Sequence, residues 1–242
     1  MQIKKLISAF IFIVPAFCWA IDRTTLEVEY SKINELKKPK NVLEIRKFFI
    51  KPACTGSNDK KNVPEWLKEL VNLEELDLGT TAEVADRQDC NIVVALPDDL
   101  RSLKKLKKFV VGDSFGKKSG DNISNIKMPT SLEILSLNRI ELKMIPKWVF
   151  TQTNLKNLTI QYGSIYQIPA EIKNLRSLET LDFLSNQVNV LPNEINTLNS
   201  LKTLNLANNN VTKKQQAKIL SLLPKVKINF VNEWDDSRAN EE

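Results

Sequence analysis

The stretch LETLDFLSNQVNVLPNEINTLNS, residues 178–200, carries the pattern on which the fold depends. Its apolar residues are spaced as L-x-x-L-x-F in the first half and as V-x-x-L-P-x-x-I-x-x-L in the second. Units that begin at Leu132 and Leu155 keep this spacing, and a further unit begins at Leu201. The four openings, Leu178 included, are each 23 residues apart. A fixed period of this length indicates a repeat protein, in which every unit packs on its neighbours.

The two halves of the unit predict different local structures. Alternate residues of the first half point to one side of an extended chain, so this half predicts a short strand. The Leu-Pro half has an apolar residue at every third position, which suits a turn of 3₁₀ or α helix. Asn186 and Asn209 lie between the halves, where a side-chain amide can turn the chain and bond its backbone. Gly163 and other residues replace this asparagine in earlier units, so we expect a less regular edge there.

This pattern resembles the leucine-rich-repeat family, in the short bacterial form whose second half carries a Leu-Pro step. The resemblance covers residues 45–230. It implies an α/β fold: a right-handed horseshoe-shaped solenoid with a parallel sheet on its concave side and 3₁₀ or α turns on its convex side. Toward the N-terminus the units that open at Ile45, Leu73 and Leu106 are 28, 33 and 26 residues long. We therefore expect leucine-rich repeats over residues 45–211.

Both ends of a solenoid need a cap, because the last unit would otherwise expose its core. Thr24 and Glu27 form an S/T-x-x-E capping box, which predicts an N-terminal helical cap over residues 21–44. Thr212 precedes a second helical run, and a short apolar alternation follows it, so residues 212–230 predict a C-terminal helix–strand cap. This ending is similar to the closing cap of bacterial exported leucine-rich-repeat proteins. Residues 231–242 are expected to form a polar tail.

Residues 1–20 have the features of an export signal. Two lysines precede an apolar run of about a dozen residues, and the small residues Cys18 and Ala20 precede a cleavage site before Ile21. Two alternatives remain: lipidation at Cys18, and a retained anchor, although the run is short for a hydrocarbon core of about 30 Å. The pattern favours a secreted, periplasmic or surface-held protein without an integral membrane segment after cleavage.

The composition argues against catalysis. The chain contains no histidine, which removes the usual general base and the commonest zinc ligand. It also lacks a phosphate-binding glycine loop, a nucleophile elbow and the paired-cysteine spacing of metal sites. We therefore expect no enzymatic activity, no cofactor and no metal site.

Two cysteines, Cys54 and Cys90, remain after the signal is removed. They lie in the insertions that follow the strands of adjacent units. An even pair in an oxidising compartment predicts a disulfide bond. Free or metal-binding thiols are the alternative.

The concave face is the expected binding surface, because its strand positions are exposed and mostly small and polar. Candidate partner-binding residues on it are Phe49, Asp77, Arg139, Gln161, Tyr162, Asp182 and Leu184. Arg139 and Tyr162 combine a planar donor with a large aromatic surface, which is the composition of an interface hot spot. The first hypothesis is a monomeric adhesion or host-interaction module that binds a protein of unknown identity and no nucleic acid. The alternative for these residues is a solvated sheet face.

A second hypothesis is a sulfated-glycan or other polyanion binder. Its candidate site is the basic edge formed by Lys104, Lys105, Lys107 and Lys108. The formal net charge of +6 falls to +4 without Lys4 and Lys5, and so mild a charge compels no anionic partner. A third hypothesis is an envelope structural protein with no foreign partner.

Two further features are interpreted as structural. The residues that follow the repeat openings alternate in sign along the chain: Arg46, Glu74, Lys107, Glu133, Lys156, Glu179 and Lys202. On strands about 4.8 Å apart, such a column predicts an exposed ladder of opposite charges that specifies the register. Trp66 and Trp148, each two residues after a proline, are expected to pack over neighbouring repeats.

Overall fold

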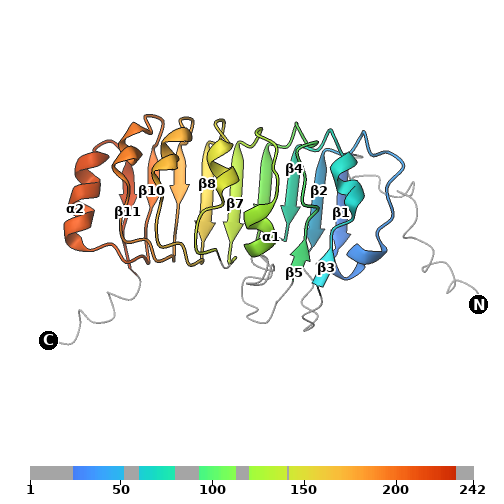
Figure 1. Cartoon of the computed structure of the whole chain (residues 1–242), viewed down its shortest axis with the longest axis horizontal. Coiled ribbons are helices and arrows are strands. Elements are labelled where there is room, and N and C mark those ends of the chain that lie inside the picture. The colour runs from blue at the N-terminus through green and yellow to red at the C-terminus, as the bar shows by residue number, and fades with distance from the viewer. Residues whose placement is uncertain (1–23, 52–59, 80–92, 113–119, 141, 233–242) are drawn as a thin grey trace, which may run out of the picture.

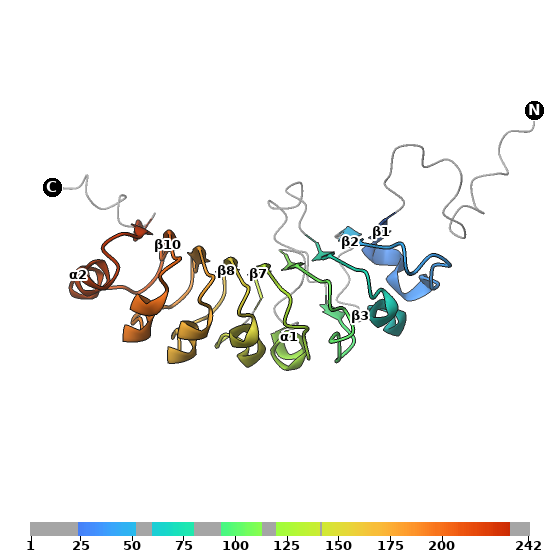
Figure 2. The same ribbon diagram turned by 90° about the horizontal axis from the view of Figure 1, so that it is seen from above.

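The computed structural model describes residues 24–51, 60–79, 93–112, 120–140 and 142–232. These residues form a curved solenoid, with a row of strands along the inside of the arc and short helices along its outside (Figures 1 and 2). In the described residues, nine strands form one parallel sheet whose spatial order follows the chain. The predicted α/β solenoid with a parallel concave sheet is confirmed.

The strands of this sheet are β1 (Thr25–Glu29), β2 (Lys47–Lys51), β4 (Glu75–Leu78), β6 (Lys108–Val111), β7 (Ile134–Asn138), β8 (Asn157–Gln161), β9 (Thr180–Asp182), β10 (Thr203–Asn205) and β11 (Lys227–Asn229). A smaller parallel pair joins β3 (Lys60–Asn62) to β5 (Val93–Ala95). The helices are η1 (Tyr30–Glu35), η2 (Glu65–Glu69), α1 (Gly120–Asn125), η5 (Lys147–Thr151), η6 (Ala170–Asn174), η7 (Asn193–Thr197) and α2 (Lys213–Leu222).

The strand register follows the leucine spacing. Leu135, Leu158, Leu181 and Leu204 pair along four adjacent strands and are all buried. The convex turns begin where the sequence places proline: Pro64, Pro146, Pro169 and Pro192 each directly precede a 3₁₀ helix. Proline suits this N-cap position because its fixed φ fits the extended backbone there, and its missing N–H would have no acceptor in the helix that follows.

The N-terminal cap differs from the predicted helix. Residues Thr25–Glu29 form strand β1, which pairs Leu26 with Phe48, and only the following six residues turn, as the 3₁₀ helix η1. The expectation of a helix beginning at Thr24 is therefore wrong. The stretch T-L-E-V-E alternates apolar and polar residues, and it covers the open edge of β2, so sheet pairing overrides the capping-box signal.

The C-terminal cap has the expected order of helix and strand. The Thr212 hydroxyl accepts a hydrogen bond from the Gln215 backbone amide, and the Thr212 backbone amide donates to the Gln215 side-chain oxygen, which completes a capping box at the start of α2. Ile219 is the buried residue of this helix. Strand β11 then pairs with β10 and ends the sheet.

The asparagine between the halves of the unit bonds the backbone of its own and the preceding repeat. Asn186 is buried; its Nδ2 donates to the Ile160 carbonyl at 2.7 Å, and its Oδ1 accepts from the Ile165 amide at 3.1 Å. Asn209 repeats this arrangement with the Phe183 carbonyl and the Val188 amide. Each asparagine therefore connects adjacent units through buried polar groups.

Glycine at position 163 leaves room for this connection. A Cβ atom added to Gly163 would lie 2.8 Å from Asn186 Oδ1. A residue larger than glycine at this position would therefore require the Asn186 side chain to shift.

The alternating charges form ion pairs between neighbouring strands. Glu133 lies 2.8 Å from Lys156 and 3.3 Å from Lys107, Arg46 pairs with Glu74 at 2.8 Å, and further along Lys202 pairs with Glu179. The Glu133 and Glu179 side chains remain 30% and 39% exposed. The predicted exposed ladder is confirmed for these pairs.

We expect Glu133→Lys to lower the thermal unfolding midpoint modestly, because it places a third positive charge between Lys107 and Lys156. The loss should shrink in 1 M salt, where the screening length falls to about 3 Å. Thermal melts at low and high ionic strength measure this. A large loss that salt does not reduce would contradict an exposed ladder.

The same ladder predicts a pH dependence. Hydrogen bonds from Lys156 and Lys107 hold the pKa of the Glu133 carboxyl below its ordinary value, and Lys202 lowers the pKa of Glu179. A carboxyl with a lowered folded-state pKa stabilises the fold above its unfolded pKa of about 4.3, and this contribution is lost as the pH falls through the folded value. The free energy of unfolding of Glu133→Gln should therefore fall less between pH 7 and pH 3 than that of the natural protein. Urea unfolding across this pH range measures the difference.

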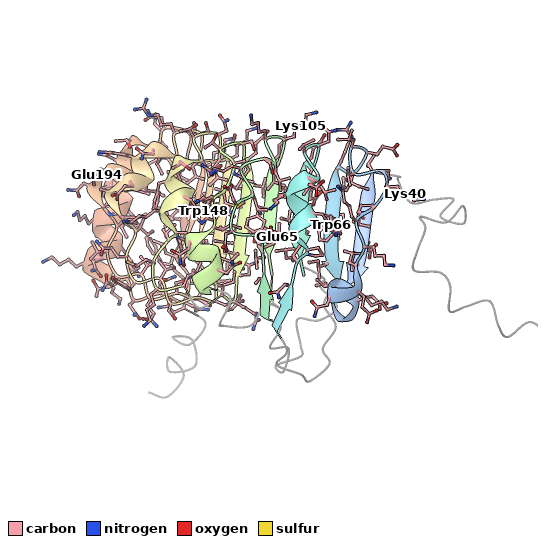
Figure 3. The ribbon with its side chains drawn as sticks, turned by 45° about the vertical axis from the view of Figure 1, so that its right-hand side comes forward. Lys40, Glu65, Trp66, Lys105, Trp148 and Glu194 are labelled. Carbon is pink, nitrogen blue, oxygen red and sulfur yellow. The ribbon has the colours of Figure 1, made fainter. Side chains whose placement is uncertain are left out.

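Trp66 and Trp148 lie on the helical side of the solenoid, as Figure 3 shows. The Trp148 indole Nε1 donates to the Ile123 carbonyl of the preceding unit at 2.8 Å, and Trp66 donates to Leu36 in the same way. The Trp66 ring meets Phe48 edge-on, with ring centroids 6.3 Å apart. The predicted packing over a neighbouring repeat is therefore confirmed for Trp148, whereas Trp66 packs against the N-terminal cap and Phe48 of its own unit.

The export signal, Cys54 and Cys90 lie outside the described residues. Cys54 precedes β3 and Cys90 precedes β5, and these two strands pair Lys60 with Val93. In the described part of the chain, no helix combines the length and apolar character needed to cross a bilayer.

We expect Cys54 and Cys90 to be disulfide-bonded under oxidising conditions, because the strands that follow them pair. Thiol titration of the unfolded, unreduced protein should find neither cysteine free. Two reactive thiols would contradict the pairing.

Candidate functional site

The concave face of β7 to β10 carries few charges. Its outward positions, paired from strand to strand, are partly exposed and mostly bear hydroxyl or amide groups: Ser136, Asn138, Thr159, Gln161, Thr180, Asp182, Thr203 and Asn205. Neighbouring positions are about 4.8 Å apart, so the polar groups form a regular field. Such a surface can make many hydrogen bonds but needs an anchor with large area to bind tightly.

Arg139 and Tyr162 lie directly after β7 and β8, at the end of this polar field. The Arg139 guanidinium lies over the Tyr162 ring, 4.6 Å from its centroid, and the Tyr162 side chain is 46% exposed. A guanidinium stacked on a tyrosine restricts both side chains before a partner arrives. The predicted adjacency of these two residues is confirmed.

The backbone at both residues is in the left-handed region. Arg139 has a φ of 54° and Tyr162 a φ of 53°, and Ser185 and Asn208 have the same value at the same position of the next two units. The repeat therefore imposes this conformation on whichever residue stands there. It costs an ordinary side chain roughly 1–2 kcal/mol and asparagine less. Arginine and tyrosine are thus present against the local backbone preference.

Asn138 adds an unpaired acceptor beside this pair. Its Oδ1 atom is buried and has no hydrogen-bond partner among the residues that the structure describes. A buried acceptor without a donor is uncommon in folded proteins.

Gln161 and Asp182 are already bonded to one another. Gln161 Nε2 donates to Asp182 at 2.8 Å, and the same carboxylate accepts the Leu184 amide at 2.9 Å. Asn205 and Asn229 make the same local bond to the amide two residues on. Asp182 therefore has a structural role in its unit, and Leu184 lies beside it, half-buried.

Phe49 and Asp77 do not join this group. They pair with one another on β2 and β4, and β6 separates them from β7. Asp77 is only 8% exposed, and Val110, its neighbour on β6, is 5% exposed. The expectation that Asp77 is an exposed concave residue is wrong. Because β6 lies between β4 and β7, the seven predicted residues fall into two separate sets.

The lysine edge is largely engaged within the protein. Lys105 donates to Asn72 at 2.8 Å, Lys107 pairs with Glu133, and Lys108 pairs with Glu75. Lys105 lies at the rim where the chain enters the strands (Figure 3). A polyanion bound here would compete with these carboxylates and this amide.

An apolar strip on the outer edge was missed by the sequence reasoning. Tyr166 and Val190 are 46% and 50% exposed in adjacent units, and they line a shallow groove of about 400 Å³ with Ile168, Ala170 and Pro192. Met144, one unit earlier, is also exposed. Apolar residues at variable positions of the unit were the signal that could have identified this strip. Among the described residues, no group of histidine, cysteine or acidic side chains has the arrangement of a metal site.

Comparison with solved structures shows which known folds this chain resembles. The leucine-rich-repeat domain of the type III effector XopL aligns with a TM-score of 0.56 at 17% identity, over 89% of this chain and 78% of that domain. Human trophoblast glycoprotein (Wnt-activated inhibitory factor 1) aligns with a TM-score of 0.55 at 17% identity, over 90% and 81% of the two chains. A leucine-rich-repeat protein of Leptospira interrogans is 21% identical, with a TM-score of 0.43. The alignment to it covers 77% of this chain and only 55% of that protein's length.

The chain is therefore a leucine-rich-repeat solenoid, and the structural likeness extends to the fold alone. No protein-family model and no curated protein matches the sequence.

Proposed function

We propose that this solenoid is a non-enzymatic module that binds another protein through the concave ends of β7, β8 and β9. The observation that carries the proposal is the Arg139–Tyr162 stack, a half-exposed aromatic and a planar donor held together where the backbone favours neither residue. The hydroxyl and amide groups at the neighbouring strand positions support it, because they offer a partner hydrogen bonds around this pair. An extended peptide segment or a loop presents both donors and apolar surface of the required kind.

Site-specific photo-cross-linking tests this surface. A photoreactive residue at Ser136, on the concave side of β7, should capture a protein from surface or host extracts. The same residue at Glu194 on the convex helix η7 (Figure 3) should not capture it. The captured protein should also be lost when Tyr162 is replaced by asparagine. Capture from Glu194 alone would place binding on the opposite side and contradict the proposal.

We further propose that the protein is exported and works as an adhesion or host-interaction module. The support is the signal-like segment at residues 1–20. Cell fractionation with N-terminal sequencing of the mature protein should find Ile21 at its start. A protein that keeps its first twenty residues in the cytoplasm would contradict export, and one lipidated at Cys18 would be an anchored form.

A further inference from the structure

The C-terminal end of the solenoid is strongly basic. Between residues 195 and 232 the sequence has no aspartate or glutamate, and it has six lysines, all exposed: Lys202, Lys213, Lys214, Lys218, Lys225 and Lys227. Of these, Lys202 pairs with Glu179, and the other five have no ion pair among the described residues. The next acidic residues in sequence, Glu233, Asp235 and Asp236, lie outside the described residues.

Three of these lysines share the outer side of α2. At 3.6 residues per turn, Lys213, Lys214 and Lys218 fall within an arc of about 140° around the helix axis. Ile219, the buried residue of the helix, points to the opposite side. Because α2 closes the end of the arc (Figures 1 and 2), no further repeat covers this side among the described residues. We call Lys213, Lys214, Lys218, Lys225 and Lys227 the cap lysines.

The cap lysines differ from the lysine edge in their surroundings. Lys105, Lys107 and Lys108 each have a side-chain partner within the protein, whereas the cap lysines have no carboxylate partner among the residues that the structure describes. Within residues 195–232, an anion that approaches the cap therefore displaces no carboxylate. The cap is also distant from the concave group on β7 to β9, since β10 and β11 lie between them and α2.

We propose that the cap lysines bind an anionic polysaccharide, with sulfate or carboxylate groups along a linear chain. Lysine ammonium groups are mobile point charges, which suit anions whose spacing varies along a polymer. An anionic bilayer fits less well, because Leu220 is the only large apolar residue of α2 that is mostly exposed, and peripheral membrane helices insert an apolar face. A single-stranded nucleic acid fits less well too, because the exposed side of α2 has no aromatic residue on which bases could stack.

Heparin binding by the full chain tests the proposal. The triple variant Lys213→Gln/Lys214→Gln/Lys218→Gln should raise the dissociation constant about tenfold, because each exposed ion pair contributes little and the three act together. Glutamine is as good a helix former as lysine, so the cap should stay folded, and circular dichroism checks this. Binding should also weaken steeply between 0.1 and 0.5 M salt.

The matched control carries the same change of charge elsewhere. Lys104→Gln/Lys105→Gln/Lys143→Gln should change heparin affinity less than about twofold. An equal or larger loss in this control, or no loss in the cap variant, would overturn the proposal. So would equally tight binding to vesicles rich in anionic lipid or to single-stranded DNA. Tyr162→Asn should leave heparin binding unchanged, so failure here is separable from failure of the concave site.

Discussion

Asn186→Ala is expected to lower the free energy of unfolding by about 3 kcal/mol, the largest effect that we predict for a single polar side chain. Its amide oxygen accepts the Ile165 amide at 3.1 Å, and its Nδ2 donates to the Ile160 and Phe183 carbonyls. Alanine leaves the Ile165 amide without this acceptor in a buried place, and an unsatisfied buried amide costs about 1–3 kcal/mol. The lost bonds also connect two repeats, so their removal weakens the stacking on which both depend.

Urea unfolding of Asn186→Ala and of Asn189→Ala measures this. Asn189 lies in the same unit but is exposed, so its replacement should change stability by less than about 0.5 kcal/mol. Equal small losses in both variants would show that the buried asparagine contributes no more than a surface residue.

Tyr162→Asn is expected to separate stability from binding. Asparagine tolerates the left-handed backbone, as Asn208 does at the same position, so the variant should be as stable as the natural protein or more stable by up to about 1 kcal/mol. Partner binding should weaken by about 2 kcal/mol, or roughly thirtyfold, because the aromatic surface that Arg139 covers is lost. Tyrosine at position 162 would then lower the stability of the fold relative to asparagine and raise the affinity for the partner.

Tyr166→Asn is the matched control, because Tyr166 is also 46% exposed and lies four residues further on. It should leave partner affinity unchanged. The affinities are measured by calorimetry with the captured partner, and stabilities by urea unfolding. A loss of affinity at Tyr166 and not at Tyr162 would move the site to the outer edge.

The repeat architecture could be predicted because the interval between apolar residues in the sequence decides which side chains are buried together. Leu158 and Leu181 align on adjacent strands since the same interval separates their units, and that interval is visible in the sequence. The same register predicts that Arg139 lies next to Tyr162, and the guanidinium lies over the ring. The proline of the repeat likewise predicted where four convex 3₁₀ turns begin, although no helix directly follows Pro97 and α1 has no proline directly before it.

What could not be predicted depends on contacts across units. The segment from Thr25 reads as a capped helix when taken alone, and only the open edge of β2 makes it a strand. The burial of Asp77 and the partners of Lys105 and Lys108 also depend on residues about 30 positions away in the sequence. Tyr166 and Val190 stand at positions that the repeat pattern leaves free, so the pattern did not single out the edge groove that they line.

Oxidative footprinting of the tyrosines, with and without the captured partner, tests the concave site most directly. Tyr162 and Tyr166 are equally exposed in the free protein, so they should react with hydroxyl radicals at similar rates. Our account predicts that the partner slows oxidation of Tyr162 severalfold and leaves Tyr166 unchanged. Unchanged oxidation of Tyr162 in the complex, or protection of Tyr166 alone, would contradict binding at the ends of β7 to β9.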